Sequence, residues 1–209
     1  LYERLVSHPA LEQIFQCAMS ALSAQANRYI VEAYDFGRFN HVVDAGGGDG
    51  TNAIALAKRF PNLKVTVYDS ESVCDIARQH IAAAGLENRV FTWVGNFLED
   101  PFPPDVDAIL FCHIFTIWSM DRNRELLRKC AQALPTNGAV VLFNMMGDDD
   151  DAGPLSTALG SPYFLTIATG EGMLHSWNDY EQGMRSAGFS SITRIGDLPL
   201  NHGMLVAEK

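Results

Sequence analysis

The chain has 209 residues, of which 47% are hydrophobic and 19% charged, and 15 basic against 25 acidic residues give a net charge of −10. This composition excludes a disordered tail, a collagen-like repeat and a coiled coil, and a chain of this length folds as one domain without disulfides. The acidic charge argues against a nucleic-acid partner and against an anionic membrane surface, and no apolar run is long enough to span a membrane. Four scattered cysteines without a Cys-x-x-Cys pair indicate no metal site and fit a cytoplasmic location.

Helix and strand patterns alternate along the chain. Apolar residues at helical spacing predict a first helix over 10–34. Strands are then expected at 41–44, 63–68, 89–94, 108–112 and 139–143, with helices between them at 51–60, 70–84 and 122–134. Loops are expected to follow, then a helix with a capping box at Ser176 that runs to Ala187, and two strands at 191–195 and 204–207. This alternation predicts an α/β fold with a doubly wound, mostly parallel sheet covered on both faces.

The strongest motif is Asp-Ala-Gly-Gly-Gly-Asp-Gly at 44–50, between the first predicted strand and the next helix. Glycine lets the backbone turn tightly and lets a ligand approach main-chain N–H groups without a Cβ in the way. A glycine cluster alone is also compatible with a tight turn that binds nothing. The motif therefore needs support from other strand ends.

Two such features follow the next strands. Asp69, with Ser70 beside it, ends the second predicted strand about 20 residues after the glycines, where an acid bonds ribose hydroxyls. Asn96 and Phe97 follow the third strand, where they are suited to hold an adenine by hydrogen bonding and stacking. Because these loops all leave the carboxyl ends of adjacent strands, they predict a site for a nucleoside-bearing ligand.

The charged residues of the glycine loop indicate which nucleoside-bearing ligand binds there. Asp44 stands just ahead of the turn and Asp49 inside it, and carboxylates suit a cationic ligand better than a pyrophosphate. S-adenosylmethionine carries a sulfonium and an ammonium group and fits this environment. A nicotinamide oxidoreductase is disfavoured by the glycine spacing, and a Walker loop is excluded because no Gly-Lys-Ser/Thr follows.

These motifs resemble those of class I S-adenosylmethionine methyltransferases, and more narrowly the small-molecule O-methyltransferases of plant phenylpropanoid and bacterial polyketide pathways. Further support comes from the segments at 33–36, Trp118 with 126–130, and 186–189. The resemblance implies a Rossmann-like, seven-stranded sheet with an antiparallel C-terminal hairpin, a helical lead-in at 1–38, a cofactor-binding domain at 39–209, and a place in secondary metabolism such as antibiotic biosynthesis. It also implies that Gly46, Gly47 and Gly48 face the methionine part of the cofactor, Asp69 the ribose, and Asn96 and Phe97 the adenine.

The sequence departs from the family in two ways. The family carries an N-terminal dimerisation domain that these residues lack, so we expect this chain alone to be less oligomeric than its relatives, with a homodimer only where such a domain is present. The general base of the family, a histidine followed by aspartate and tryptophan, falls on Thr116 when registered on Trp118 and Cys130. The aspartate falls on Ile117 and the supporting glutamate near Leu174. As aligned, the acid–base residues of the family are absent.

Two histidines remain candidates for proton transfer. His113 follows the fourth strand and either takes a proton or only bonds the cofactor, while His175 precedes the capping box in the region that closes the acceptor pocket. The other four histidines are interpreted as structural: His8, His41, His80 and His202. Transfer without any base is the third alternative, because an ionised acceptor needs mainly alignment.

Aromatic and sulfur-containing side chains gather in the loops that should cover the acceptor and predict a pocket for a small, flat, aromatic or polyketide-like molecule. The candidate acceptor residues are Met19, Phe115, Thr116, Trp118, Met146, Tyr163, Met173 and His175. O-methylation follows from the resemblance, and the missing base leaves C- or N-methylation open. The alternatives are a cofactor-binding relative that catalyses a decarboxylation, elimination or pericyclic step, and a non-catalytic subunit.

Overall fold

The fold is described from a computed structural model, which describes residue 5 and residues 7–26, 28–150 and 152–209. The chain divides into two compact units, Glu3–Leu110 and Phe111–Lys209. This division does not test the boundary expected after residue 38, which stays a prediction.

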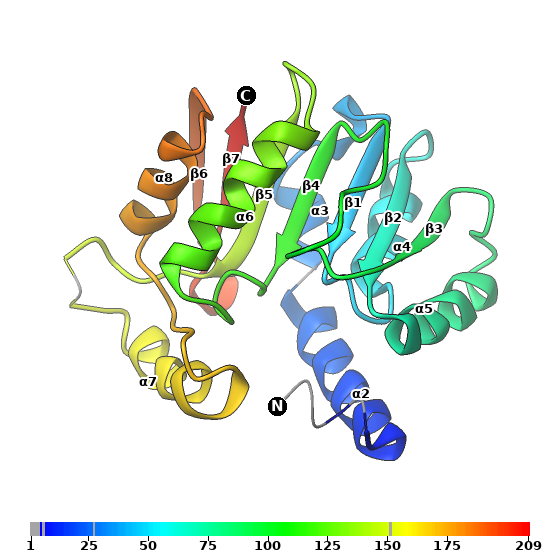
Figure 1. Ribbon diagram of the computed structural model, residues 1–209, viewed down its shortest axis with the longest axis horizontal. Coiled ribbons are helices and arrows are strands. Elements are labelled where there is room, and N and C mark those ends of the chain that lie inside the picture. The colour runs from blue at the N-terminus through cyan, green and yellow to red at the C-terminus, as the bar shows by residue number, and fades with distance from the viewer. Residues whose placement is uncertain (1–4, 6, 27, 151) are drawn as a thin grey trace. The chain divides into compact units, whose positions relative to one another are not determined.

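The first unit holds four parallel strands and the helices that connect them (Figure 1). In chain order its elements are α2 (Pro9–Ala26), α3 (Arg28–Ala33), a 3-10 turn (Phe36–Arg38), β1 (His41–Ala45), α4 (Thr51–Arg59), β2 (Lys64–Asp69), α5 (Glu71–Ala83), β3 (Val90–Val94) and β4 (Ala108–Cys112), whose last two residues belong to the second unit. Val42 of β1 lies opposite Val65 of β2 on one side and Ala108 of β4 on the other. All residues of β4 and all but the first of β1 are buried, and continuous burial is typical of parallel strands covered on both faces.

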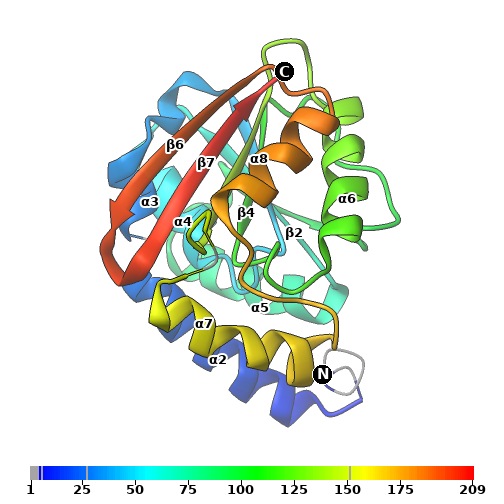
Figure 2. The same cartoon turned by 90° about the vertical axis from the view of Figure 1, so that its left-hand side faces the viewer.

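The second unit is built on an antiparallel set of strands. Its elements are α6 (Met120–Ala133), β5 (Ala139–Met145), α7 (Leu155–Tyr163), a π-helix (Phe164–Ala168), α8 (Trp177–Ser186), β6 (Ser191–Leu198), a 3-10 turn (Pro199–Asn201) and β7 (His202–Glu208). β7 pairs antiparallel with both β5 and β6, and the long β6–β7 hairpin stands out in Figure 2. The seven strands have the order β3-β2-β1-β4-β5-β7-β6. The predicted fold class, a mostly parallel doubly wound sheet with an antiparallel C-terminal hairpin, is confirmed.

The range predicted for the first helix is helical in the described residues. It holds α2, which runs to Ala26, and α3, which runs from Arg28, and residue 27 lies outside the described residues. Apolar residues that predict the helix stay exposed, since Leu11, Ile14 and Leu22 keep 47%, 66% and 64% of their surfaces. Helical periodicity therefore gave the correct secondary structure here without showing which face of α2 is covered.

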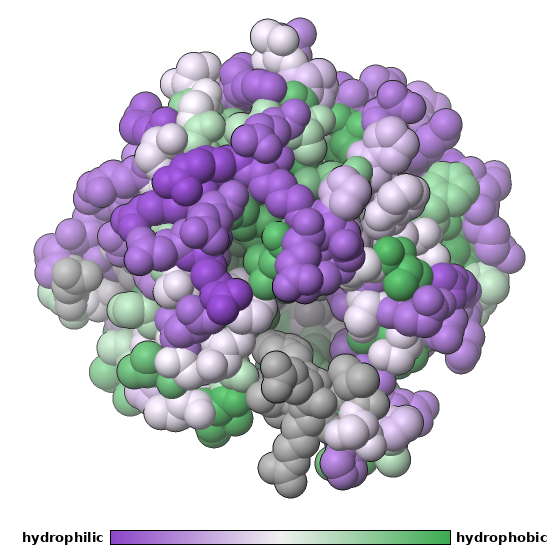
Figure 3. Space-filling model, in the orientation of Figure 1, coloured by the Kyte–Doolittle hydropathy of each residue, from purple (hydrophilic) through white to green (hydrophobic). Residues whose placement is uncertain are grey.

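The segment after β5 is helical where loops were expected. α7 contains Gly160 and Pro162, both unfavourable inside a helix, and the chain continues directly into the π-helix. The expectation that Tyr163 stands on an irregular loop is therefore wrong, because this residue ends α7. Apolar side chains of α7 are exposed, Leu155 at 74% and Leu159 at 71%, and Figure 3 shows apolar surface over this helix.

The capping box is confirmed. The Ser176 hydroxyl accepts a hydrogen bond from the Asp179 backbone N–H (3.2 Å), and the Asp179 carboxylate accepts one from the Ser176 backbone N–H (3.2 Å). This reciprocal arrangement satisfies two N–H groups that the first turn of a helix leaves without partners. It fixes the start of α8 directly after His175.

Candidate active site

The glycine turn between β1 and α4 has a backbone that only glycine adopts readily. Gly46, Gly48 and Gly50 have φ angles of 70°, 59° and 83°. Gly47 is restricted differently, because a Cβ there would lie 2.7 Å from the Asp44 Oδ2 atom and 2.9 Å from the Asp44 carbonyl oxygen. The turn therefore keeps its main chain bare, so a ligand can approach the backbone without meeting a side chain. The N–H groups of Gly46 and Gly50 are hydrogen-bonded to the carbonyl oxygens of Tyr68 and Gly47.

Asp44 lies fully buried beneath this turn. Neither oxygen of its carboxylate has a hydrogen-bond partner among the residues that the structure describes. Burial, followed by the charges of Asp69 and Asp49, raises the pKa of Asp44 to about 7. A buried carboxylate without a partner is costly, so this group is poised to interact with a positively charged ligand.

Asp69 ends β2 and closes the other side of the turn. Its Oδ2 atom accepts a hydrogen bond from the Gly48 N–H (3.0 Å), and its Oδ1 atom accepts one from the Ser70 N–H (2.8 Å). Burial raises the pKa of Asp69, and these two backbone hydrogen bonds oppose that shift. Asp69 thus links the carboxyl ends of β1 and β2 through its hydrogen bond with Gly48, and its contact with a ribose stays a prediction.

Two further residues contact each other at the turn: Asp49, whose carboxylate was predicted to suit a cationic ligand, and His80, which was not predicted to act there. Asp49 is buried, and its Oδ1 atom accepts hydrogen bonds from the Thr51 N–H (3.1 Å) and the Thr51 hydroxyl (2.7 Å). Its Oδ2 atom lies 3.3 Å from Nδ1 of His80. His80, interpreted from sequence as structural, therefore contacts the glycine loop. It lies 31 positions after Asp49 in the sequence, and no motif indicates that the two residues are in contact.

In the loop after β3, Asn96 and Phe97, which were predicted to contact adenine, contact other residues of the chain. The Asn96 side-chain oxygen accepts a hydrogen bond from the Leu98 N–H (3.1 Å), which forms a local turn. The Phe97 ring packs edge-on against Tyr68, with ring centroids 6.0 Å apart. Asn96 is exposed and its oxygen retains a second lone pair, so its predicted contact with a nucleobase stays a prediction.

In the second unit, His113 lies in an aromatic environment. Its backbone is left-handed, with φ at 58°, and its ring centroid lies 5.6 Å from Phe143 and 5.0 Å from His202. Burial, with a smaller contribution from His202, lowers the pKa of His113 to about 3. His113 is therefore neutral at physiological pH and a weak proton acceptor. His202, interpreted from sequence as structural, is its direct neighbour.

His175 is also buried, between α8 and the segment before α6. Its Nε2 atom lies 3.2 Å from the Trp118 carbonyl oxygen, so this nitrogen carries the proton and donates it. Burial lowers the pKa of His175, and the contact with the Trp118 carbonyl opposes the shift. The remaining nitrogen, Nδ1, is left as the acceptor of a neutral ring.

The predicted acceptor residues fall into three groups by exposure: buried, half-buried and exposed. Phe115 is fully buried and packs against Phe111 (4.9 Å) and Tyr180 (6.1 Å), as a core residue does. Thr116 is 1% exposed, and its hydroxyl donates a hydrogen bond to the His113 carbonyl oxygen (2.9 Å). The others lie as follows: Met146 buried, Trp118 half-buried, Tyr163 and Met173 exposed, and Met19 half-buried on α2 of the first unit.

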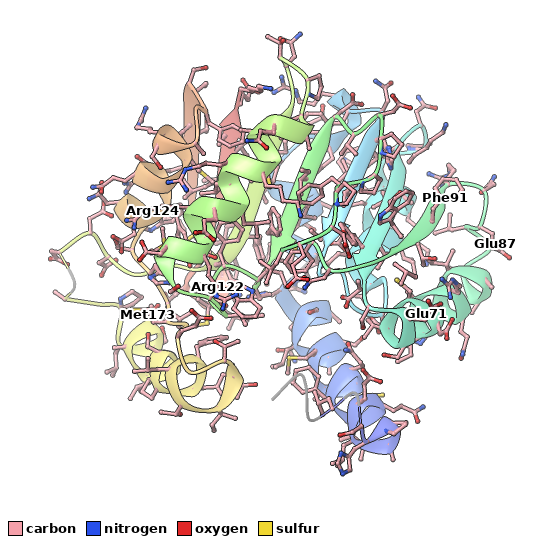
Figure 4. All side chains as sticks on the ribbon, in the orientation of Figure 1. Glu71, Glu87, Phe91, Arg122, Arg124 and Met173 are labelled. Atoms are coloured by element: carbon pink, nitrogen blue, oxygen red, sulfur yellow. The ribbon has the colours of Figure 1, made fainter. Side chains whose placement is uncertain are left out.

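The Thr116 hydroxyl is thus already committed to the backbone, which agrees with the inference that position 116 supplies no base. Trp118 has a buried indole N–H without a partner in the described part of the chain. Arg122, labelled in Figure 4, stacks over the Trp118 ring at 5.3 Å and pairs with Glu171 at 2.9 Å. These contacts fix the Trp118 ring, and its buried N–H keeps no hydrogen-bond partner among the described residues.

The glycine turn, the acid after β2 and the strand order define a class of protein. The O-methyltransferase domain model matches residues 1–190, and the chain belongs to this family of S-adenosylmethionine-dependent methyltransferases. It is 38% identical over 213 residues to L-tyrosine C(3)-methyltransferase of Streptomyces lavendulae, covering 100% of this chain and 58% of that protein. It is 34% identical over 168 residues to 3-hydroxy-5-methyl-1-naphthoate 3-O-methyltransferase of Streptomyces sahachiroi, covering 80% and 48%.

Among solved structures, the chain resembles the apo form of the S-adenosylmethionine-dependent methyltransferase SibL, with a TM-score of 0.87 and 40% identity, covering 100% of this chain and 62% of that one. The chain thus spans roughly half to three fifths of the length of these relatives. Within the described residues, no helix has the length and apolar character needed to cross a bilayer.

The residues at the glycine turn fit S-adenosylmethionine. Asp44 offers a buried carboxylate that lacks a partner in the described structure, and a positive ligand charge would compensate it. Gly47 and Gly48 keep the turn free of side chains, and Asp69 is a hydrogen-bond acceptor for hydroxyl groups. These four residues belong to the first unit, which therefore carries the donor-binding features by itself.

Proposed function

We propose that this protein transfers a methyl group from S-adenosylmethionine to a small aromatic acceptor. The observation that carries the proposal is the unpartnered, fully buried Asp44 carboxylate beneath a bare glycine turn, with Asp69 at the next strand end. When bound, S-adenosylmethionine supplies an electrophilic methyl group on a positively charged sulfur. The carboxylates around the turn favour that charge.

The acceptor proposed is a phenol. The two curated relatives described above are named for acting on tyrosine and on a hydroxynaphthoate, both of which carry an aromatic hydroxyl. In this chain Trp118, Tyr163 and Met173 supply aromatic and sulfur surface that is not sealed in the core. Such side chains suit a flat apolar ring, and the Trp118 N–H suits an acceptor oxygen.

Proton transfer to His113 is not part of this proposal. A phenol has a pKa of about 10, whereas the pKa of His113 is lowered to about 3. Moving a proton between them would cost about 10 kcal/mol, since one pKa unit corresponds to about 1.4 kcal/mol. His175, whose pKa is also lowered, is the better acceptor through Nδ1. We propose that alignment of the acceptor contributes more than either base.

The test is an acceptor screen with S-adenosylmethionine labelled in its methyl group. L-tyrosine and a hydroxynaphthoate are incubated with the protein, and mass spectrometry follows label in the acceptor. Label in the phenol, on oxygen or on ring carbon as magnetic resonance decides, supports the proposal, and labelling at low donor concentration should fall in the Asp69→Ala control. A chemically changed acceptor without label would instead indicate a non-methylating reaction, such as decarboxylation or elimination, and contradict it.

Two accessory proposals concern setting and partners. The described cysteines, Cys17, Cys74, Cys112 and Cys130, are all free thiols, which supports a reducing, cytoplasmic location. The net charge of −10 supports a small-molecule partner over nucleic acid. Fractionation of producing cells and a DNA-binding titration would test the two.

A further inference from the structure

One face of α2 lies over the glycine turn. Glu12, Gln16 and Ser20 are spaced four residues apart and so share a side of the helix. The Ser72 hydroxyl donates a hydrogen bond to the Glu12 carboxylate (3.0 Å), and the Ser20 hydroxyl lies 3.2 Å from the Thr51 hydroxyl. Between them, the Gln16 side-chain oxygen lies 3.5 Å from the position of a Cβ on Gly48. The helix therefore spans the turn from the start of α5 to the start of α4.

Glu12 is buried where a surface helix would bury an apolar residue. Its exposure is 8%, whereas its neighbour Leu11 keeps 47%. A buried carboxylate needs compensation, and the hydrogen bond from Ser72 supplies part of it. In the described parts of the chain, no lysine, arginine or histidine pairs with Glu12. Its charge instead acts on Asp69. Burial is the largest cause of the raised pKa of Asp69, and the charge of Glu12 raises that pKa further.

Glu12 also lines an open cavity of about 330 Å³ beside the turn. The walls come from α2, from Asp49 of the turn and from Ser72 and neighbouring residues of α5. This volume is within the usual range of ligand pockets, about 300–1,000 Å³. The Glu12 carboxylate thus borders space that a ligand can reach, in a cavity that Asp49 of the turn also lines.

We propose that Glu12 is a specificity-determining residue that makes the site prefer the cationic methyl donor over its neutral product. The inference rests on the proposed cofactor. S-adenosylmethionine and S-adenosylhomocysteine share their adenosine and amino acid parts and differ in one methyl group and one positive charge at sulfur. A carboxylate near the turn therefore stabilises the donor selectively, which helps the product to leave once the charge is lost.

The experiment compares the affinities of S-adenosylmethionine and S-adenosylhomocysteine for the same protein by calorimetry, without acceptor. Glu12→Gln keeps the shape of the side chain and removes its charge. We expect this variant to lose roughly tenfold more affinity for S-adenosylmethionine than for S-adenosylhomocysteine, the usual size of a charge-assisted interaction. The ratio of the two affinities is the readout, because a partly unfolded sample lowers both equally.

Two control variants separate charge from structure. Glu71→Gln is the same substitution at the start of α5, where the side chain is 72% exposed (Figure 4), and should leave the ratio unchanged. Ser72→Ala removes the hydrogen bond to Glu12 but keeps the charge, so any loss should fall equally on both ligands.

An unchanged ratio in Glu12→Gln would overturn the inference, whether both affinities fall together or neither falls. A ratio that moves as much in Glu71→Gln would also overturn it, because net charge would then be the cause. If the unaltered protein binds neither ligand, the proposed cofactor fails first, which distinguishes that failure from failure of the role of Glu12.

Discussion

Replacing Asp44 with asparagine should remove most of the pH dependence that this residue gives to the stability of the fold. The Asp44 carboxylate is fully buried and has no hydrogen-bond partner in the described structure. Burial, and then the charges of Asp69 and Asp49, raises its pKa to about 7. The folded protein therefore holds a proton on Asp44 at pH values where the unfolded chain has already lost it.

The direction and size of the effect follow from linkage. Between about pH 4, the ordinary pKa of aspartate, and about pH 7 the folded state binds one more proton than the unfolded state, so raising the pH lowers the free energy of unfolding. A gap of about three pKa units corresponds to about 4 kcal/mol. This contribution is fully present below pH 4 and is lost by the time the pH exceeds 7. Asp44→Asn has no proton to lose and lacks this slope.

The assay is urea unfolding of both proteins at pH 4, 5, 6, 7 and 8, followed by circular dichroism. The free energy of unfolding of Asp44→Asn minus that of the unaltered protein should rise by up to about 4 kcal/mol from pH 4 to pH 8. Other titrating groups are common to both proteins and cancel in the difference. Parallel stability profiles over this range would refute the argument that Asp44 is buried without compensation.

Three further substitutions test the cofactor site, the base and the core. Asp69→Ala should weaken S-adenosylhomocysteine binding by about 1.5–3 kcal/mol in calorimetry, the cost of losing hydrogen bonds to a charged group; unchanged affinity would remove Asp69 from the site. His113→Gln should lower kcat less than about tenfold and leave the rate profile between pH 5 and 8 unchanged, since the pKa of His113 is already lowered to about 3; a fall of about 10²–10⁴ would identify it as a general base after all. Phe115→Ala should cost about 3–5 kcal/mol of stability in urea unfolding, because the ring is fully buried against Phe111; a cost below about 1 kcal/mol would return Phe115 to the acceptor pocket.

The sequence predicted correctly those features of the fold that depend on local chemistry. The glycine turn, Asp69 and the capping box at Ser176 each follow from short-range rules, namely backbone freedom, strand ends and helix capping. β4 has the predicted bounds, Ala108–Cys112, because a short, wholly apolar run between turn residues has few other structures open to it.

The misses have physical causes. The segment that forms α7 was predicted as a loop, and it contains Gly160 and Pro162, which weaken a helix locally. A hydrogen bond from the buried Thr157 hydroxyl to the Met146 carbonyl oxygen (3.0 Å) ties this helix to the residue after β5. The contacts of Glu12 with Ser72 and of His113 with His202 join residues 60 and 89 positions apart. No periodicity or motif in one sequence reports such pairs.

Exposure was the other gap between pattern and structure. Apolar residues such as Ile14 predicted α2 correctly, yet Ile14 is 66% exposed and the helix buries Glu12 instead. A hydrophobic pattern indicates where a helix lies in the sequence, but it does not indicate which face of the helix contacts a charged loop. The sequence pattern therefore did not indicate that Glu12, on which the proposed role of α2 depends, is buried.

The central claim is that the donor lies on the glycine turn, and a crystal structure of the protein with S-adenosylhomocysteine tests it most directly. We expect the ribose hydroxyls within hydrogen-bond distance of Asp69, the homocysteine chain against the backbone of Gly46–Gly48, and the Glu12 carboxylate on the side of the ligand that faces α2. Density for the ligand away from this turn, or a ribose without contact to Asp69, would contradict the account.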